Sequence, residues 1–177
     1  MLTFNFSKHK IEDTNGLMLD VGCGEGRHIF GVMESYPQMK CIGIDPHKDS
    51  LKKAEEGYEY FQSISNAGAE FMEASAYCLP FPDETFDLVV CSEVLEHLHE
   101  YIDAVKEIKR VLKKGGKLII YEPNKLNPLI WLTHLIDKNE RGLLRVGSFK
   151  RYREIFSDTD FKIEEESYNG IVIGPSS

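Results

Sequence analysis

The chain has 177 residues, of which 42% are hydrophobic, and it carries a formal net charge of −8 with a mean hydropathy of −0.31. This length suits one domain with a sizeable core, so we expect a single domain over residues 1–177. No apolar run approaches the about 20 residues needed to cross a bilayer, and the N-terminal stretch MLTFNFSKHK lacks the apolar region of a secretory signal. We therefore expect a cytoplasmic protein without stable membrane insertion. The negative charge disfavours nucleic acid and favours a small molecule as the partner.

Cysteine spacing disfavours two further classes of protein. The cysteines lie far apart and form no CxxC pair; they are Cys23, Cys41, Cys78 and Cys91. This spacing favours reduced, buried thiols over a disulfide framework or a zinc site, so we expect no metal.

Short apolar runs alternate along the chain with stretches of helical period, a pattern typical of repeated βα units around a parallel sheet. Strands are expected at residues 16–21, 40–45, 69–74, 86–91, 117–122 and 161–167, and helices near 26–36, 47–64, 101–114 and 148–157. Near the end, the pair Asn169-Gly170 is a hairpin signal, which predicts that the last strand runs antiparallel. The fold class is therefore α/β.

The clearest helix is expected in the stretch YIDAVKEIKRVLKKGG. Its apolar side chains recur at helical spacing, at Ile102, Val105, Ile108 and Leu112. Gly115 and Gly116 follow, and we expect them to stop the helix.

A glycine-rich stretch, LDVGCGEGR, includes the end of the first expected strand. Gly22, Gly24 and Gly26 stand at alternating positions there, so the chain either turns sharply or lets a ligand come close to its backbone. Ligands of parallel α/β proteins bind beyond the carboxyl ends of the strands, which is where this loop is placed. Asp45 ends the second strand about 20 residues later, where an acid accepts hydrogen bonds from ribose hydroxyls. Loop and acid together predict an adenosine-bearing cofactor.

Two cofactors fit that description. Dinucleotide folds favour G-x-G-x-x-G, and Arg27 occupies the position of its third glycine. The loop reads G-x-G-x-G, which suits a ligand without a pyrophosphate, and Asp20 before it can pair with an ammonium group directly or through water. An adenosine with an amino-acid tail is S-adenosylmethionine. A nicotinamide-dependent oxidoreductase and a catalytically inactive cofactor-binding protein of the same fold remain the alternatives.

The sequence resembles the class I S-adenosylmethionine-dependent methyltransferases, in particular the small-molecule branch with the ubiquinone and menaquinone biosynthesis methyltransferases. The resemblance covers residues 16–165. LDVGCGEG resembles the cofactor loop, GIDPHKDSLKKA the second-strand acid and its helix, LPFPDETFDLVVCSEVLEHL the fourth-strand region, and EIKRVLKKGGKLII the helix and turn into the fifth strand. It implies a Rossmann-like, doubly wound, mainly parallel sheet of six to seven strands with an antiparallel final strand.

The resemblance also implies roles for single residues. The glycine loop lets the backbone approach the methionyl part of the cofactor, Asp45 binds the ribose, and Pro46 packs beside the adenine. Ala76 offers its backbone to the adenine edge, and Ser92 lines the site past the fourth strand. The family usually has an acid before that alanine. Here the residue is Ser75, which accepts a hydrogen bond from the adenine amine but carries no charge, so we expect the adenine to be bound more weakly.

Two further positions need an interpretation. Cys23 lies inside the loop, among the cofactor-binding positions. Because no nearby histidine or second cysteine suggests activation, Cys23 fits a small residue that fills a crowded turn. The turn before the fifth strand, usually K-P-G-G in the family, has Lys114 in place of the proline, a change we expect to be neutral.

His97 and the segment 124–148 are the candidates for recognising the methyl acceptor. His97 follows the fourth strand, where a general base can reach an acceptor hydroxyl. The alternative is that EHL closes a short helical turn and His97 caps it or bonds to backbone. The family places a variable cover over the substrate at 124–148, which we expect to act as a lid.

The reaction that follows is methyl transfer by direct displacement at the sulfonium, in which most of the catalysis comes from holding acceptor and methyl group in line. The fourth strand runs into CSEV and not into the N-P-P-Y type motif of methyltransferases that act on amines of adenine or glutamine. We therefore expect a small-molecule acceptor that is methylated at oxygen or carbon. The identity of the acceptor and the oligomeric state stay open at this point.

Overall fold

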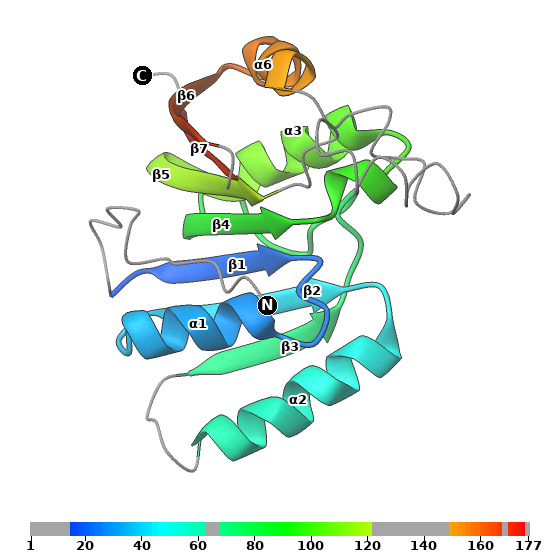
Figure 1. The fold of residues 1–177 in the computed structure, drawn as a ribbon, viewed down its shortest axis with the longest axis vertical. Coiled ribbons are helices and arrows are strands. Elements are labelled where there is room, and N and C mark those ends of the chain that lie inside the picture. The colour runs from blue at the N-terminus through cyan, green and yellow to red at the C-terminus, as the bar shows by residue number, and fades with distance from the viewer. Residues whose placement is uncertain (1–14, 63–67, 122–148, 168–169, 176–177) are drawn as a thin grey trace.

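The computed structural model of the chain describes residues 15–62, 68–121, 149–167 and 170–175. The strands are β1 (Leu17–Val21), β2 (Lys40–Asp45), β3 (Ala69–Glu73), β4 (Phe86–Ser92), β5 (Leu112–Tyr121), β6 (Phe161–Ser167) and β7 (Gly170–Pro175). The helices are α1 (Arg27–Ser35), α2 (Lys48–Gln62), α3 (Tyr101–Val111), α6 (Phe149–Asp158) and the short 3₁₀ turn η2 (Leu95–His97). Figure 1 shows the strands stacked one above another with helices beside them.

The strands form one sheet in the order β3-β2-β1-β4-β5-β7-β6. The first five strands pair in parallel, and β7 pairs antiparallel with both β5 and β6. The α/β, Rossmann-like architecture and the antiparallel final strand are therefore confirmed. The resemblance implies a mainly parallel sheet of six to seven strands. The parallel part contains five of them, β1 to β5, and the paired strands β7 and β6 bring the sheet of the described residues to seven.

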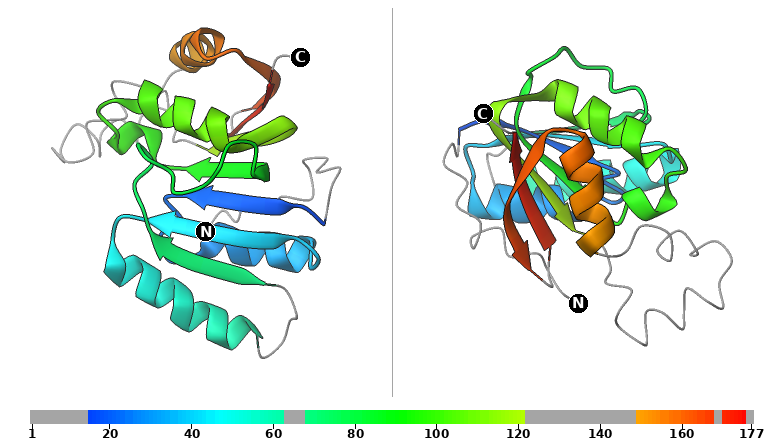
Figure 2. Two further views of the ribbon diagram at one scale, coloured as in Figure 1. Left: turned by 180° about the vertical axis from the view of Figure 1, so that it is seen from behind. Right: turned by 90° about the horizontal axis from the view of Figure 1, so that it is seen from above.

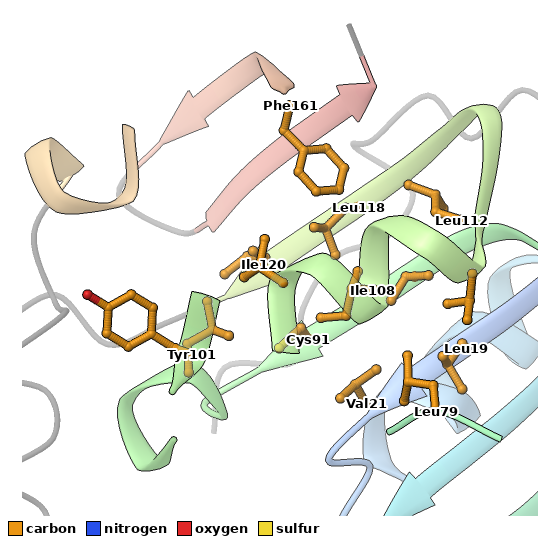
Figure 3. Packing of buried hydrophobic residues seen from close by; sticks show 14 of the residues in the cluster. Leu19, Val21, Leu79, Cys91, Tyr101, Ile108, Leu112, Leu118, Ile120 and Phe161 are labelled. Carbon is orange, nitrogen blue, oxygen red and sulfur yellow. The ribbon is translucent and has the colours of Figure 1, made fainter. Parts of the chain in front are cut away.

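Helices cover both faces of the sheet. α1 and α2 pack in an apolar cluster that includes Ile29, Val32 and Leu51, while α3 and α6 contribute to a second cluster on the opposite face. Figure 2 shows α1 and α3 on opposite sides of the strands. In Figure 3, Ile108 of α3 lies over β4 and β5, close to Cys91. Within the described ranges, no helix combines the length and the apolar character needed to cross a membrane.

Helix α3 ends earlier than its apolar spacing predicts. The sequence predicts a helix over 101–114 stopped by two glycines, but the last helical residue is Val111. Leu112 is already extended, with φ −79° and ψ 131°, and it pairs with Phe86 of β4. Gly115, with φ +78°, lies inside β5 instead of capping the helix. Pairing with β4 therefore overrides the helical spacing of Leu112, because that side chain is equally well buried in a strand.

The cysteines are all free thiols. Cys23, Cys41 and Cys91 are buried, as expected, whereas Cys78 is exposed in the loop after β3, contrary to the expectation. In the part of the chain that the structure describes, no group of three or more His, Cys, Asp or Glu side chains is arranged to hold a metal ion.

Candidate cofactor site

The carboxyl ends of β1 to β4 meet along one edge of the sheet, which the arrowheads of β1 and β4 mark in Figure 1. β1 lies between β2 and β4, where the strand order reverses, and open α/β sheets bind ligands at such a position. Every residue for which the sequence predicts a role in the site lies at the end of one of these strands or in the segment after it. The predicted residues therefore converge on one edge.

The loop between β1 and α1 follows a backbone path that favours glycine. Gly22, Gly24 and Gly26 all have positive φ, of 72°, 53° and 80°. A Cβ on Gly22 would collide with Cγ2 of Val94, from the segment after β4, whereas a Cβ on Gly24 would have no heavy atom within 4 Å. The loop is therefore packed at Gly22 and open at Gly24, as the close approach of a ligand requires.

Backbone N–H groups fix this loop to the end of β2. Gly22 and Cys23 both donate to the carbonyl oxygen of Ile44, at 2.8 and 2.9 Å. Gly24 N–H donates to Oδ2 of Asp45 at 3.0 Å. The loop and the acid, 21 residues apart in the sequence, are therefore in direct contact.

Asp20 is a fully buried carboxyl group near the end of β1, with 0% exposure. It pairs with Gly43 of β2 and Val90 of β4, so it lies inside the sheet. Neither carboxyl oxygen has a hydrogen-bond partner among the described residues. Burial, and secondly the negative charge of Asp45, raise the pKa of Asp20 to about 8. A carboxyl group in this environment either keeps its proton or needs a cation beside it.

Asp45 ends β2 and is 7% exposed. Its Oδ1 accepts a hydrogen bond from His47 N–H at 2.8 Å and lies 3.0 Å from Nδ1 of the same residue, while Oδ2 faces Gly24. Pro46, the next residue, is exposed. Asp45 therefore presents a carboxylate beside the glycine loop, where the sequence places the ribose.

The loop after β3 lies beside the end of β2, because Ala74 N–H donates to the carbonyl oxygen of Asp45 at 3.4 Å. Ser75 is exposed, and its Oγ accepts a hydrogen bond from Tyr77 N–H at 3.3 Å. Ala76 is half-buried. Ser75 and Ala76, which with Pro46 are predicted to meet the adenine, thus lie next to the predicted ribose acid.

The segment after β4 brings His97 to the same edge. Ser92, half-buried, ends β4, and His97 N–H donates to the Val94 carbonyl oxygen at 3.0 Å. The His97 side chain is 47% exposed, and its Nε2 lies 3.6 Å from Oε1 of the buried Glu96. The short helical turn and its backbone bond are therefore present, while the general-base role of His97 stays a prediction.

The side chain of Cys23, within the glycine loop, packs against Gly43 of β2. Its Sγ lies 2.8 Å from the place where a Cβ on Gly43 would stand. Burial, then the negative charges of Asp20 and Asp45, raise the pKa of its thiol far above the ordinary value. A neutral, buried thiol is a packing group and not a nucleophile.

Sequence reasoning missed four residues at this edge, namely His47, Tyr77, Val94 and Glu96. The Tyr77 hydroxyl accepts a hydrogen bond from His99 N–H at 3.0 Å, which joins the loop after β3 to the segment after η2. His47 follows Asp45 by two positions, a spacing that could have suggested their contact. Val94 and Glu96 carry no such signal, because their positions depend on packing between distant strands.

The expected lid at residues 124–148 lies outside the described residues.

A groove of about 430 Å³ lies at the opposite edge of the sheet, lined among others by Leu17, Lys40 and Ala69. These three residues begin or adjoin the amino ends of β1, β2 and β3. The groove is therefore remote from the glycine loop and belongs to a different surface.

Comparison with known proteins identifies the family. Residues 19–120 match a family described as a methyltransferase domain. The chain is 37% identical over 117 residues to an uncharacterised methyltransferase of Schizosaccharomyces pombe, a match that covers 64% of this chain and 42% of that protein. It is 34% identical over 115 residues to a demethylmenaquinone methyltransferase of Lactococcus lactis, covering 64% and 44%. The chain thus spans less than half the length of these two relatives.

The fold is shared with solved methyltransferase structures. An S-adenosylmethionine-dependent methyltransferase from Methanosarcina mazei superimposes with a TM-score of 0.77 at 19% identity, over 98% of this chain and 99% of that one. The family match covers more than half of the chain and includes the glycine loop, Asp45 and His97. The chain therefore belongs to the class I S-adenosylmethionine-dependent methyltransferases, and S-adenosylmethionine is the cofactor of that family.

Proposed function

We propose that this protein transfers a methyl group from S-adenosylmethionine to a small-molecule acceptor, at oxygen or carbon, by direct displacement. Two observations support a small acceptor. The chain reads CSEV at the end of β4, without the N-P-P-Y type motif, and one similar protein is named for a small molecule, demethylmenaquinone. The net charge of −8 disfavours a nucleic acid acceptor.

The observation that carries the proposal is the buried carboxyl group of Asp20. It has no hydrogen-bond partner in the part of the chain that the structure describes, and it lies two residues before Gly22 of a loop that is open at Gly24. An ammonium group would supply the positive charge and the donors that this carboxyl group lacks. The methionyl end of S-adenosylmethionine carries such a group, so the residues present fit the cofactor.

Four other residues are proposed to hold the adenosine part. Asp45 accepts hydrogen bonds from the ribose hydroxyls, because its carboxylate faces the glycine loop. Pro46 and Ala76 contact the adenine, with the Ser75 hydroxyl as the uncharged acceptor for its amine. Ser92 lines the site beyond β4. The glycine loop, Cys23 included, lies along the methionyl part.

The chemistry needs little from the protein beyond alignment. S-adenosylmethionine supplies a methyl group on a sulfonium, whose carbon is already electrophilic. The protein holds the acceptor in line with that carbon. For a hydroxyl acceptor, Nδ1 of His97 takes the proton, and Glu96, whose Oε1 lies 3.6 Å from Nε2 of the same ring, stabilises the resulting imidazolium. We further propose that residues 124–148 select the acceptor.

Titration calorimetry with S-adenosylhomocysteine and with NAD tests the proposal. We expect binding of the first and none of the second. Asp45→Ala should weaken S-adenosylhomocysteine binding by about 1.5 to 3 kcal/mol, the contribution of hydrogen bonds to a charged group. Asp49→Ala, which removes an exposed acid from the first turn of α2, is the control and should bind normally. Heat with NAD and none with S-adenosylhomocysteine would overturn the assignment.

A further inference from the structure

Asp45 has too few open acceptor positions for two ribose hydroxyls. An ionised carboxylate offers about four lone-pair positions, two on each oxygen. Oδ1 receives the backbone N–H of His47 at 2.8 Å and lies 3.0 Å from Nδ1 of its ring, which must carry the proton because a carboxylate oxygen only accepts. Oδ2 receives the N–H of Gly24 at 3.0 Å. Oδ1 is therefore filled, and only one position remains, on Oδ2.

Of these three donors, the His47 ring is the one that can leave. The Gly24 N–H belongs to a loop that is anchored to Ile44. The His47 N–H belongs to the turn into α2, where the backbone N–H groups of Ser50 and Leu51 donate to the His47 carbonyl oxygen. The ring, in contrast, is 78% exposed, and a rotation of the side chain removes Nδ1 without moving the backbone.

We propose that the His47 imidazole occupies the acceptor position that the second ribose hydroxyl of the cofactor needs, and that the ring leaves Asp45 when the cofactor binds. This inference rests on the proposed function. With the ring displaced, Oδ1 and Oδ2 each keep one backbone donor and each offer one open position. That arrangement matches two neighbouring hydroxyl groups, so His47 lowers the affinity for any ligand that uses both.

The opposite role would be that the ring orients Asp45 for the ribose. The two roles predict opposite effects of removing it. A competing ring makes His47→Ala bind more tightly, whereas an orienting ring makes it bind more weakly. A ligand with a single ribose hydroxyl separates them further, because it can use the open position on Oδ2 and leave the ring in place.

Calorimetry with 5′-methylthioadenosine and its 2′-deoxy and 3′-deoxy analogues makes the test. We expect His47→Ala to lower the Kd of 5′-methylthioadenosine by roughly 2- to 10-fold, the range for one exposed hydrogen bond, and to leave both deoxy analogues unchanged. His47→Phe, which keeps a ring without a donor, should behave alike. Lys48→Ala is the matched control, because Lys48 is 79% exposed and pairs with Glu73.

Weaker binding of 5′-methylthioadenosine by both His47 variants would overturn the inference and give the ring an orienting role. Equal tightening of all three ligands would also overturn it, because the effect would then not depend on the second hydroxyl. If the wild-type protein bound neither S-adenosylhomocysteine nor 5′-methylthioadenosine, the proposed function itself would fail. Binding of both ligands by the wild type, with no change in the His47 variants, would overturn the inference alone.

Discussion

Asp20 lies near the end of β1 and Asp45 ends the neighbouring strand β2, and the chain surrounds their carboxyl groups differently. Asp45 accepts hydrogen bonds through both of its oxygens, from Gly24 and His47. Asp20 receives none from the residues that the structure describes, and it is buried completely. The charge on Asp45 further disfavours a charge on Asp20. We therefore expect a cation that binds at this edge to pair with Asp20, and hydroxyl donors to bind Asp45.

Asp20→Asn should flatten the pH dependence of stability in the absence of ligand. The folded protein holds the Asp20 proton up to a pKa of about 8, against an ordinary value of 3.8. The proton therefore adds to the free energy of unfolding in full below the ordinary pKa of 3.8. This contribution decreases as the pH rises from there through the folded-state pKa of about 8, by at most about 1.4 kcal/mol per pH unit. Urea unfolding at about pH 5 and about pH 7 measures the loss.

The wild-type protein should lose more free energy of unfolding between these two pH values than Asp20→Asn. The exposed Asp49 provides the control, because Asp49→Asn removes a carboxyl group that is not buried. Identical pH slopes for the wild type and Asp20→Asn would show that the Asp20 carboxyl group is ionised in the folded protein.

His97→Ala should lower turnover by roughly 10² to 10⁴-fold if His97 is the general base, with S-adenosylhomocysteine affinity preserved. The wild-type rate should fall at low pH as the ring takes up a proton, and the variant should lack this acid limb. Methyl transfer is measured against pH with a hydroxyl acceptor found in a screen of phenols and quinols. His99→Ala, an exposed histidine two positions further, is the control. A His97 variant with most of its activity and the same acid limb would leave alignment as the main contribution of the protein.

At the scale of elements, the glycine loop depends on two neighbouring strands. Gly22 sits against Val94, which follows β4, and donates to Ile44 of β2. Gly24, two residues further, has no such neighbour and contacts the side chain of Asp45 only through its N–H. One glycine of the loop is therefore required for packing, and the other leaves room for a ligand.

Alanine at these two glycines should separate the two requirements. Both variants place a side chain at positive φ, which costs about 1–2 kcal/mol. Gly22→Ala also collides with Val94, so it should lose roughly 1–3 kcal/mol more of its free energy of unfolding than Gly24→Ala. Gly24→Ala should stay folded and lose S-adenosylhomocysteine binding, because its methyl group enters the open side of the loop. Urea unfolding and calorimetry measure both effects.

The double variant Gly22→Ala/Val94→Ala checks the cause. Measured against Val94→Ala alone, the cost of Gly22→Ala should shrink, since the colliding methyl group is gone. Equal costs in both backgrounds would attribute the whole effect to the backbone, and normal ligand binding by Gly24→Ala would place the ligand elsewhere.

The sequence predicts these elements well where the signal is local. Apolar period and glycine placement locate most helices and strands to within a few residues, and they place Asp45 beside the loop. The exception among the strands is β5, which begins at Leu112 and not at residue 117. The end of α3 is wrong because Leu112 fits the helical period and a strand position equally, and only the pairing with Phe86 decides. The contact of Gly22 with Val94 could not be predicted, since it joins segments that are far apart in the chain.

At the scale of the whole molecule, the proposed cofactor site uses one part of the chain, and the last two strands, β7 and β6, lie outside that part. All the residues proposed to bind the cofactor lie within 19–120, which matches the family. β7 and β6 extend the sheet beyond β5, away from the glycine loop. β5 also ends at the site edge, because Glu93 N–H, just past the end of β4, donates to the carbonyl oxygen of Tyr121 at 2.8 Å. Tyr121, the last residue of β5, therefore lies at the same edge of the sheet as the proposed cofactor site.

Because β5 ends at this edge, we predict that residues 124–148, which follow it in the sequence, bind the methyl acceptor and do not contribute to cofactor binding. Replacing them with a short Gly/Ser linker should leave the Kd of S-adenosylhomocysteine nearly unchanged, because Asp20, the glycine loop and Asp45 all precede the replaced segment. The same variant should lose methyl transfer to every acceptor that the wild type methylates, since nothing then holds the acceptor in line. Calorimetry and a methyl-transfer assay measure the two effects on one preparation. A variant that stays folded but no longer binds S-adenosylhomocysteine would show that the segment belongs to the cofactor site.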